Sequence, residues 1–117
     1  MSTPILQQAP SELRDELLAR AAAQRQGNGT DADNTRWLAC LVAVHGWPSR
    51  RHVGTDGALA ALQLAARAPL PYRRSWIPKI TNAIRTASVP AQPARDFIDQ
   101  TIISGRPLGV RGDRRDS

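Results

Sequence analysis

Residues 45–54 read HGWPSRRHVG, and the fold depends on how the chain turns within this stretch. A glycine followed by Trp-Pro closes the apolar helical run before it, and Val-Gly introduces the run after it, as expected of residues that end and restart helices. Five residues form this predicted joint between two helices: Gly46, Trp47, Pro48, Val53 and Gly54. The four residues inside the joint form a predicted exposed tip that contacts an anion or a partner: Ser49, Arg50, Arg51 and His52.

Apolar residues recur at helical spacing on both sides of the joint. Before it, the spacing predicts helices over residues 11–26 and from residue 31 or 33 to residue 45. After it, the spacing predicts helices over residues 55–68, from residue 75 towards a linker at residues 89–93, and over residues 93–104. The residues expected to cap or open these helices are Ser11, Asp31 or Asp33, Thr55, Ser75 and Pro93. The predicted fold class is all-α, a compact bundle of four to five short helices.

The composition agrees with a small helical domain. The chain has 117 residues, of which 41% are hydrophobic and only 4% are aromatic, so strand-forming residues are scarce while alanine is abundant. This length fits one domain, which we expect over residues 11–105, between a flexible N-terminus (1–10) and a flexible basic tail (106–117). An alternative for the end of the chain is a short β-hairpin with strands at residues 101–103 and 108–110.

The net charge of +6 is concentrated in the middle third of the chain. Residues 50–85 hold seven cationic side chains against Asp56 alone, whereas the two flanking segments are nearly balanced. A local field of this kind attracts phosphate, nucleic acid or an acidic protein partner. Eight residues form the binding surface that we expect in this segment: Arg50, Arg51, His52, Arg67, Tyr72, Arg73, Arg74 and Trp76.

Two features argue against nucleic acid as the partner. All the cationic residues except Lys79 are arginine, which together with the abundant alanine indicates a GC-rich bacterial genome rather than selection for phosphate contacts. The helix after the joint would be the recognition helix of a helix-turn-helix, yet its polar side chains over residues 55–66 are only Thr55, Asp56 and Gln63. We therefore expect a protein partner or a paralogue, with an anionic ligand as a second option. Weak, non-specific contact of the basic segment with a nucleic-acid backbone is a third option.

Sequence motifs for cofactors, metals and disulfides are absent. No phosphate-binding or dinucleotide-binding glycine pattern occurs, so we expect no cofactor. His45 and His52 have no second cluster of ligands, so we expect no metal. Cys40 has no disulfide partner and lies in an apolar run, where we expect a buried thiol. We expect no signal peptide and no membrane span, and the predicted location is the cytoplasm.

A second hypothesis gives the protein an enzyme activity. In it, Asp99 and either His45 or His52 act as acid and base, while arginines clamp an anionic substrate. This hypothesis requires a cavity that contains Asp99 together with one of the two histidines.

The spacing around the joint resembles that of a bacterial family called domain of unknown function 6624. The shared pattern is Asp33-Asn34, Trp37-Leu38, Gly46-Trp47-Pro48, Val53-Gly54, Gly57-Ala58 and Ala60-Ala61. The resemblance covers residues 12–110, and it implies a fold rather than an activity.

The polar motifs of that family are mostly replaced in this chain. Its Gln-His-Ala-Asp segment is replaced by Ala66-Arg67-Ala68-Pro69, and its Asp-Arg-Val by Asp99-Gln100-Thr101. Its Gly-x-Pro-Gln step becomes Gly105-Arg106-Pro107-Leu108, and its closing Tyr-Gly-Thr-Gln has no counterpart at residues 109–112. Because the joint is kept while these polar groups are lost, we expect a non-catalytic member with a degenerate site that acts as an accessory protein.

Overall fold

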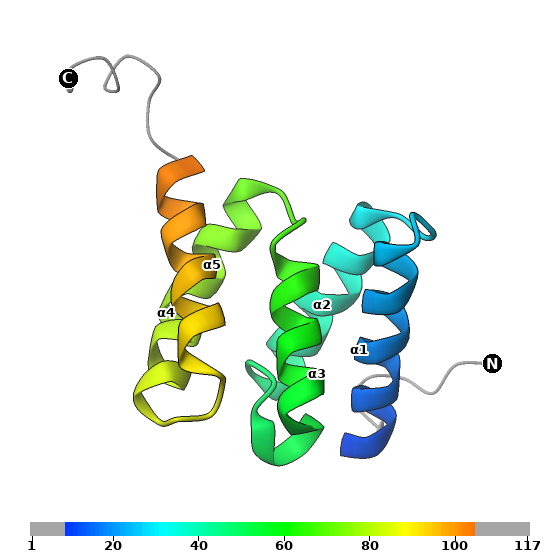
Figure 1. The fold of residues 1–117 in the computed structure, drawn as a ribbon, viewed down its shortest axis with the longest axis horizontal. Helices are drawn as coiled ribbons and strands as arrows, with labels where there is room; N and C mark the ends of the chain where they lie inside the picture. Colours follow the sequence, from blue (N-terminus) through cyan, green and yellow to red (C-terminus); the bar gives the residue numbers. More distant parts are fainter. Residues whose placement is uncertain (1–8, 105–117) are drawn as a thin grey trace.

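Five α-helices make up the part of the chain that the computed structural model describes, residues 9–104 (Figure 1). Their bounds are Pro10–Arg25 for α1, Asp31–His45 for α2, Arg50–Ala65 for α3, Leu70–Arg85 for α4 and Ala91–Ser104 for α5. The all-α prediction is confirmed. The hairpin alternative is wrong for its first strand, because residues 101–103 continue α5 and Thr101 is buried on its inner face. The second strand and the predicted tail lie outside the described residues.

The helices alternate in direction along the chain, as short connections require. In Figure 1, α1 and α3 run the same way side by side with α2 behind them, and α4 and α5 form an antiparallel pair on the other side of α3. Buried apolar side chains from all five helices join in one core. The largest fully buried apolar side chains are Leu17, Leu38, Leu41, Leu64, Ile80 and Val53.

The most extensive contact between helices joins α1 to α3, and small residues on α3 permit it. Leu17 and Ala21 of α1 are buried in the core to which α3 contributes four small side chains: Ala58, Ala60, Ala61 and Ala65. Gly57 begins this small face, and a Cβ atom there would lie 2.8 Å from the Cβ atom of Val53. Real Cβ atoms do not approach so closely, so this position requires glycine.

The joint has the backbone that a helix stop requires. Gly46 ends α2 with a φ of 80°, and Gly54 kinks α3 with a φ of 74°, both in the left-handed region that favours glycine. Residues 50–53 form a helical turn before this kink, so α3 begins at Arg50 with Ser49 before it, and the predicted start at Thr55 is wrong. Arg50, Arg51 and His52 are exposed, as predicted for the tip. The turn forms because the carbonyl oxygen of Ser49 accepts the N–H groups of His52 and Val53, both at 3.0 Å.

Two helix starts before the joint differ from the prediction. α1 begins at Pro10, ahead of the predicted Ser11, and the carboxylate of Glu12 accepts the N–H of the residue before Pro10 at 2.8 Å. Pro10 therefore belongs to the helical domain and not to the predicted flexible N-terminus, whose residues 1–8 lie outside the described part. The cap of α2 is Thr30, whose hydroxyl accepts the N–H of Asp33 at 3.0 Å.

The helix α4 begins at Leu70, five residues before the predicted start, because Pro71 occupies the first turn, where its missing N–H costs nothing. Ser75 lies inside α4, and its hydroxyl donates to a backbone carbonyl in the preceding turn at 2.7 Å. Pro78 is also interior, where it removes one hydrogen bond of the helix ladder. α5 begins at Ala91, two residues before the predicted start.

Candidate functional site

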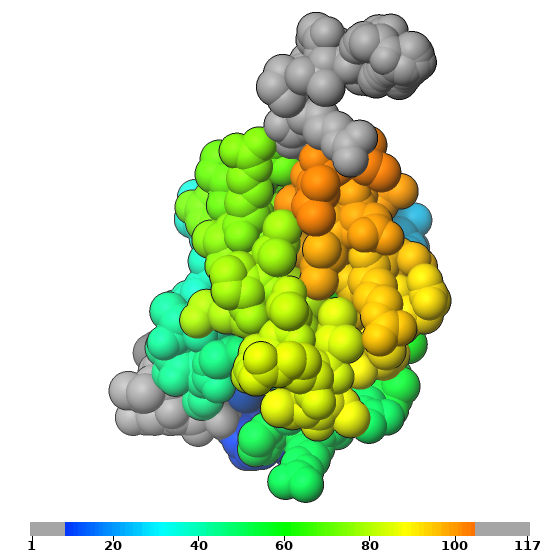
Figure 2. Space-filling view, turned by 90° about the vertical axis from the view of Figure 1, so that its left-hand side faces the viewer, coloured from blue at the N-terminus to red at the C-terminus, as the bar shows by residue number. Residues whose placement is uncertain are grey.

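The start of α3 is fastened to the connection between α4 and α5. The backbone N–H of Arg50 donates to the carbonyl oxygen of Ser88 at 2.7 Å, and the Arg50 guanidinium donates to the carbonyl oxygen of Ala87 at 2.7 Å. Figure 2 shows the residues after α4, in yellow, lying against the green residues at the start of α3. Two segments far apart in the sequence are thereby held side by side.

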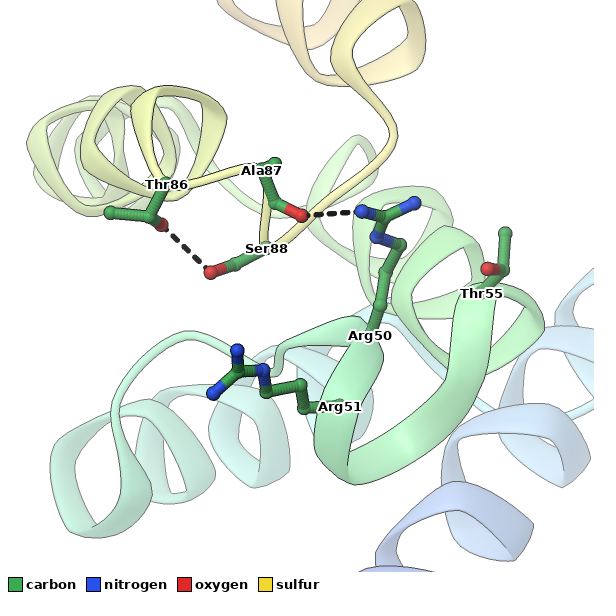
Figure 3. A pocket seen from close by; sticks show the side chains of 6 residues that line it. All are labelled: Arg50, Arg51, Thr55, Thr86, Ala87 and Ser88. Carbon is green, nitrogen blue, oxygen red and sulfur yellow. Dashed lines mark hydrogen bonds between the residues drawn. The ribbon is translucent and has the colours of Figure 1, made fainter.

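A cavity of about 550 Å³ lies at this contact (Figure 3). Its lining consists of Arg50, Arg51, Thr55, Thr86, Ala87 and Ser88, and we call it the Arg51 cavity. Two guanidinium groups and three hydroxyls therefore border one space, and no carboxylate is among the lining side chains. In Figure 3, Arg50 points towards Ala87, while Arg51 extends on the side of Thr86 and Ser88.

The donors in the Arg51 cavity are only partly used. Arg51 is exposed and makes no hydrogen bond or ion pair with the described residues. The hydroxyls of Thr86 and Ser88 lie 2.7 Å apart, and Thr86 also donates to backbone carbonyls of the last turn of α4. Because hydroxyl hydrogens rotate freely, both hydroxyls can redirect a hydrogen bond to an anion. The cavity thus offers charged and neutral donors to one acceptor group.

The carboxylate nearest in sequence to the Arg51 cavity is already paired. Asp56 follows Thr55, but it accepts two hydrogen bonds from Arg14 of α1, one of them at 3.1 Å from Nε to Oδ1. This hydrogen bonding holds the pKa of Asp56 below its ordinary value of 3.8, and it raises the pKa of Arg14. Since the negative charge of Asp56 is balanced by Arg14, the two arginines of the cavity keep a net positive field.

The two histidines share a different, smaller cavity. A space of about 310 Å³ is lined by Pro10, Leu13, Leu41, His45, Gly46, Trp47, Pro48, His52 and Val53, and Asp99 is not among these residues. His52 contacts the Ser49 hydroxyl through Nδ1 at 2.9 Å, which is a contact within one helical turn. The arrangement of Asp99 with a histidine that the enzyme hypothesis requires is therefore not formed in this cavity.

The remaining residues of the predicted binding surface do not gather beside Arg50 and Arg51. Trp76 lies in the core, as its apolar spacing with Ile80 and Ile84 predicts, and not on the predicted binding surface. It is 3% exposed and packs against Trp47 with ring centroids 5.9 Å apart. Tyr72 is 41% exposed and also contacts Trp76, with ring centroids 6.0 Å apart. A hydrophobic indole at this helix position gains more from burial than from solvent contact.

The other three predicted arginines lie around the opposite end of α3. Arg67 follows that end and lies 3.9 Å from Asp31. Arg73 is half-buried beside α5, and its Nε has no hydrogen-bond partner among the described residues. Arg74 is exposed on α4. Because α3 spans roughly 20 Å or more, the basic middle third forms two separate groups rather than one surface.

Three residues of the site were not predicted from the sequence. Thr86, Ala87 and Ser88 join the Arg51 cavity through the connection between α4 and α5, and Thr55 was assigned only as a helix cap. The only hint of their role in the sequence is that two hydroxyl residues, in the run Thr-Ala-Ser, directly follow the last basic residue of α4. Cys40, expected to be buried, is exposed on α2.

The structure also bears on metals and membranes. Among residues 9–104, no group of three or more His, Cys, Asp or Glu side chains is placed to hold a metal ion. None of the five described helices has the length and apolar content that a membrane crossing requires.

Comparison with protein families, curated proteins and solved structures finds no match for this chain. What the site binds is therefore inferred from its own side chains.

Proposed function

We propose that this protein is a non-catalytic helical binding protein that holds an anionic group of its partner in the Arg51 cavity. The observation that carries the proposal is the lining, in which two arginines and three hydroxyl side chains border about 550 Å³ without a carboxylate. Guanidinium and hydroxyl groups both donate hydrogen bonds to phosphate or carboxylate oxygens, and those from arginine carry a full charge. An accessory protein that retains such a group needs these donors and no reactive side chain.

Binding accounts for the side chains of this cavity better than catalysis does. Its lining lacks a histidine or carboxylate to move a proton, and its hydroxyls have no general base beside them. Asp99 and the histidines, the residues of the enzyme hypothesis, lie outside it. The resemblance to domain of unknown function 6624 supports the same proposal, because the joint that positions Arg50 and Arg51 is the part of that pattern that this chain retains.

A compact anionic group suits the cavity better than a nucleic-acid strand. A strand requires cations along an extended track. Arg67 and Arg73 lie around the far end of α3 from Arg50 and Arg51, and Arg67 is near Asp31. The positive field that remains at the cavity is therefore local.

Isothermal titration calorimetry of orthophosphate into the protein tests this function. We expect the wild type to bind phosphate and Arg51→Gln to lose at least about tenfold in affinity, because a hydrogen bond to a charged group contributes about 1.5–3 kcal/mol. Arg51 is the better target than Arg50, since Arg50 also holds the connection after α4.

Arg36→Gln is the matched control for this titration. It removes the same charge from α2, where the Arg36 side chain is 75% exposed, and we expect its phosphate affinity to stay within about twofold of the wild type. Equal losses in the two variants would mean that phosphate responds only to net charge. Absence of phosphate binding to the wild type would contradict the proposed function.

A further inference from the structure

A second cavity adjoins the Arg51 cavity and shares two of its lining residues. It has a volume of about 260 Å³ and is lined by Gly46, Trp47, Ser49, Lys79, Asn82, Ala83, Thr86 and Ser88. We call it the Lys79 cavity. Thr86 and Ser88 line both spaces, so these two residues lie at the boundary between them. Their hydroxyl oxygens are 2.7 Å apart. A ligand that contacts these two hydroxyls is within reach of both cavities.

The Lys79 cavity repeats the chemistry of the Arg51 cavity. Its lining includes one cation, several neutral polar side chains and no carboxylate. Lys79 is exposed and makes no hydrogen bond or ion pair with the described residues. Trp47 also lines this cavity, and its indole N–H is buried and has no hydrogen-bond partner among the described residues. Both Lys79 and Arg51 are thus available to an anion.

The three cations flank the shared hydroxyls. Arg50 and Arg51 line one cavity, Lys79 lines the other, and Thr86 and Ser88 lie between. A single small anion that binds at the arginines leaves Lys79 without a partner. Two linked anionic groups that meet at the hydroxyl pair neutralise charge on both sides at once, and the link removes the entropy cost of binding the second group separately.

We propose that the two cavities are adjoining subsites for one ligand with two linked phosphoryl groups, of the inorganic pyrophosphate or organic diphosphate class. This proposal rests on the proposed function, because it takes the Arg51 cavity as the first subsite. Phosphoryl groups fit better than carboxylates, since the lining offers more donors than the two oxygens of a carboxylate can accept. Lys79 is not part of the binding surface predicted from the sequence. In this proposal it is the residue that favours a diphosphate over a single phosphate.

Calorimetric titration with pyrophosphate and with orthophosphate, each at constant ionic strength, tests the two subsites. The wild type should bind pyrophosphate at least about tenfold more tightly than orthophosphate. Lys79→Gln should lose this preference while it keeps orthophosphate affinity within about threefold. Arg51→Gln should weaken both ligands, and the control Arg36→Gln should weaken neither.

The outcomes separate this inference from the proposed function. If the wild type binds orthophosphate and pyrophosphate equally, or if Lys79→Gln keeps the preference, the two-subsite proposal is wrong and the single anion site stands. If the wild type binds neither, both proposals are wrong. A peptide with two adjacent aspartates is the carboxylate probe, and tighter binding of that peptide than of pyrophosphate would overturn the phosphoryl assignment.

Discussion

The guanidinium of Arg50 donates to the carbonyl oxygen of Ala87 at 2.7 Å, and this contact decides where the candidate site forms. Ala87 has a φ of 56°, in the left-handed region that a residue with a Cβ atom seldom adopts. Together with the Arg50 N–H bond to Ser88, the contact holds the hydroxyls of Thr86 and Ser88 beside Arg51. The site therefore forms only where the start of α3 contacts the connection between α4 and α5.

The backbone of Ala87 gives a first prediction. The left-handed conformation costs an alanine about 1–2 kcal/mol, whereas glycine adopts it freely but loses about 0.5–1 kcal/mol through its more flexible unfolded chain. We therefore expect Ala87→Gly to raise the free energy of unfolding by about 1 kcal/mol or less. Urea denaturation followed by circular dichroism measures it, and a lower denaturation midpoint would contradict the strain at Ala87.

A second prediction concerns Gly57 at the contact of α1 with α3. In an exposed helix, replacing glycine by alanine stabilises by about 1 kcal/mol. Here the added Cβ atom would lie 2.8 Å from the Cβ atom of Val53, and overpacking of this kind costs about 1–3 kcal/mol. We expect Gly57→Ala to lower the melting temperature. A higher melting temperature would contradict this, because it would mean that the backbone of α3 shifts at the Gly54 kink to accommodate the added Cβ atom without destabilising the fold.

The place of Trp76 gives a third prediction. Because its ring is buried against Trp47, Trp76→Ala should lower the free energy of unfolding by about 3–5 kcal/mol. Tyr72→Ala, a change at a neighbouring but exposed ring, should cost less than about 1 kcal/mol and is the control. Chemical denaturation of the two variants distinguishes them. An effect of Trp76→Ala as small as that of Tyr72→Ala would contradict the contribution of the buried Trp76 ring to stability.

The pair of Arg14 with Asp56 gives a prediction on acid stability. Since the pKa of Asp56 is lower in the folded protein than its ordinary value of 3.8, the folded state binds fewer protons, and the pair stabilises the fold above that value. The contribution is lost as the pH falls through the folded pKa. Asp33, whose pKa is lowered by Arg20, adds to the same acid sensitivity.

The variant Asp56→Asn measures this contribution. We expect its urea midpoint to lie below that of the wild type at pH 6 and the difference to shrink progressively as the pH falls below 3.8. Asp99→Asn is the control, because Asp99 is exposed and makes no hydrogen bond or ion pair with the described residues. A difference between Asp56→Asn and the wild type that stayed constant with pH would mean that packing, not charge, joins α1 to α3 here.

The sequence was sufficient to predict the helices and the joint, because these depend on local chemistry. Gly46 and Gly54 adopt the positive φ values that a helix end or kink requires, and apolar spacing identified the inner faces. Helix starts were less predictable, because several residues compete for each cap. Thr30 and the two acids that follow it are all good caps for α2, and Thr30 is the one used. Ser75 is a good cap in sequence, but α4 begins earlier, with Pro71 in its first turn.

Only part of the candidate site could be predicted from the sequence. Charge identifies Arg50 and Arg51, but two of the three hydroxyls in the lining come from Thr86 and Ser88, and the tertiary hydrogen bonds of Arg50 hold that segment close. The sequence predicts two places for Trp76, the core and the binding surface, because an aromatic residue among arginines is equally typical of an interface and of a helix with one buried face. Whether such an aromatic side chain is buried or exposed depends on which other element packs against it, and here Trp47 packs against Trp76.

Chemical-shift mapping tests most directly that the Arg51 cavity is an anion site. Orthophosphate is titrated into protein labelled with nitrogen-15 at constant ionic strength, and amide and arginine side-chain signals are followed. We predict saturable shifts at residues 50, 51, 55 and 86–88, and their loss in Arg51→Gln. Shifts that spread evenly over all exposed arginines, or that cluster around Arg67 and Arg73 instead, would contradict the assignment of this cavity as the binding site.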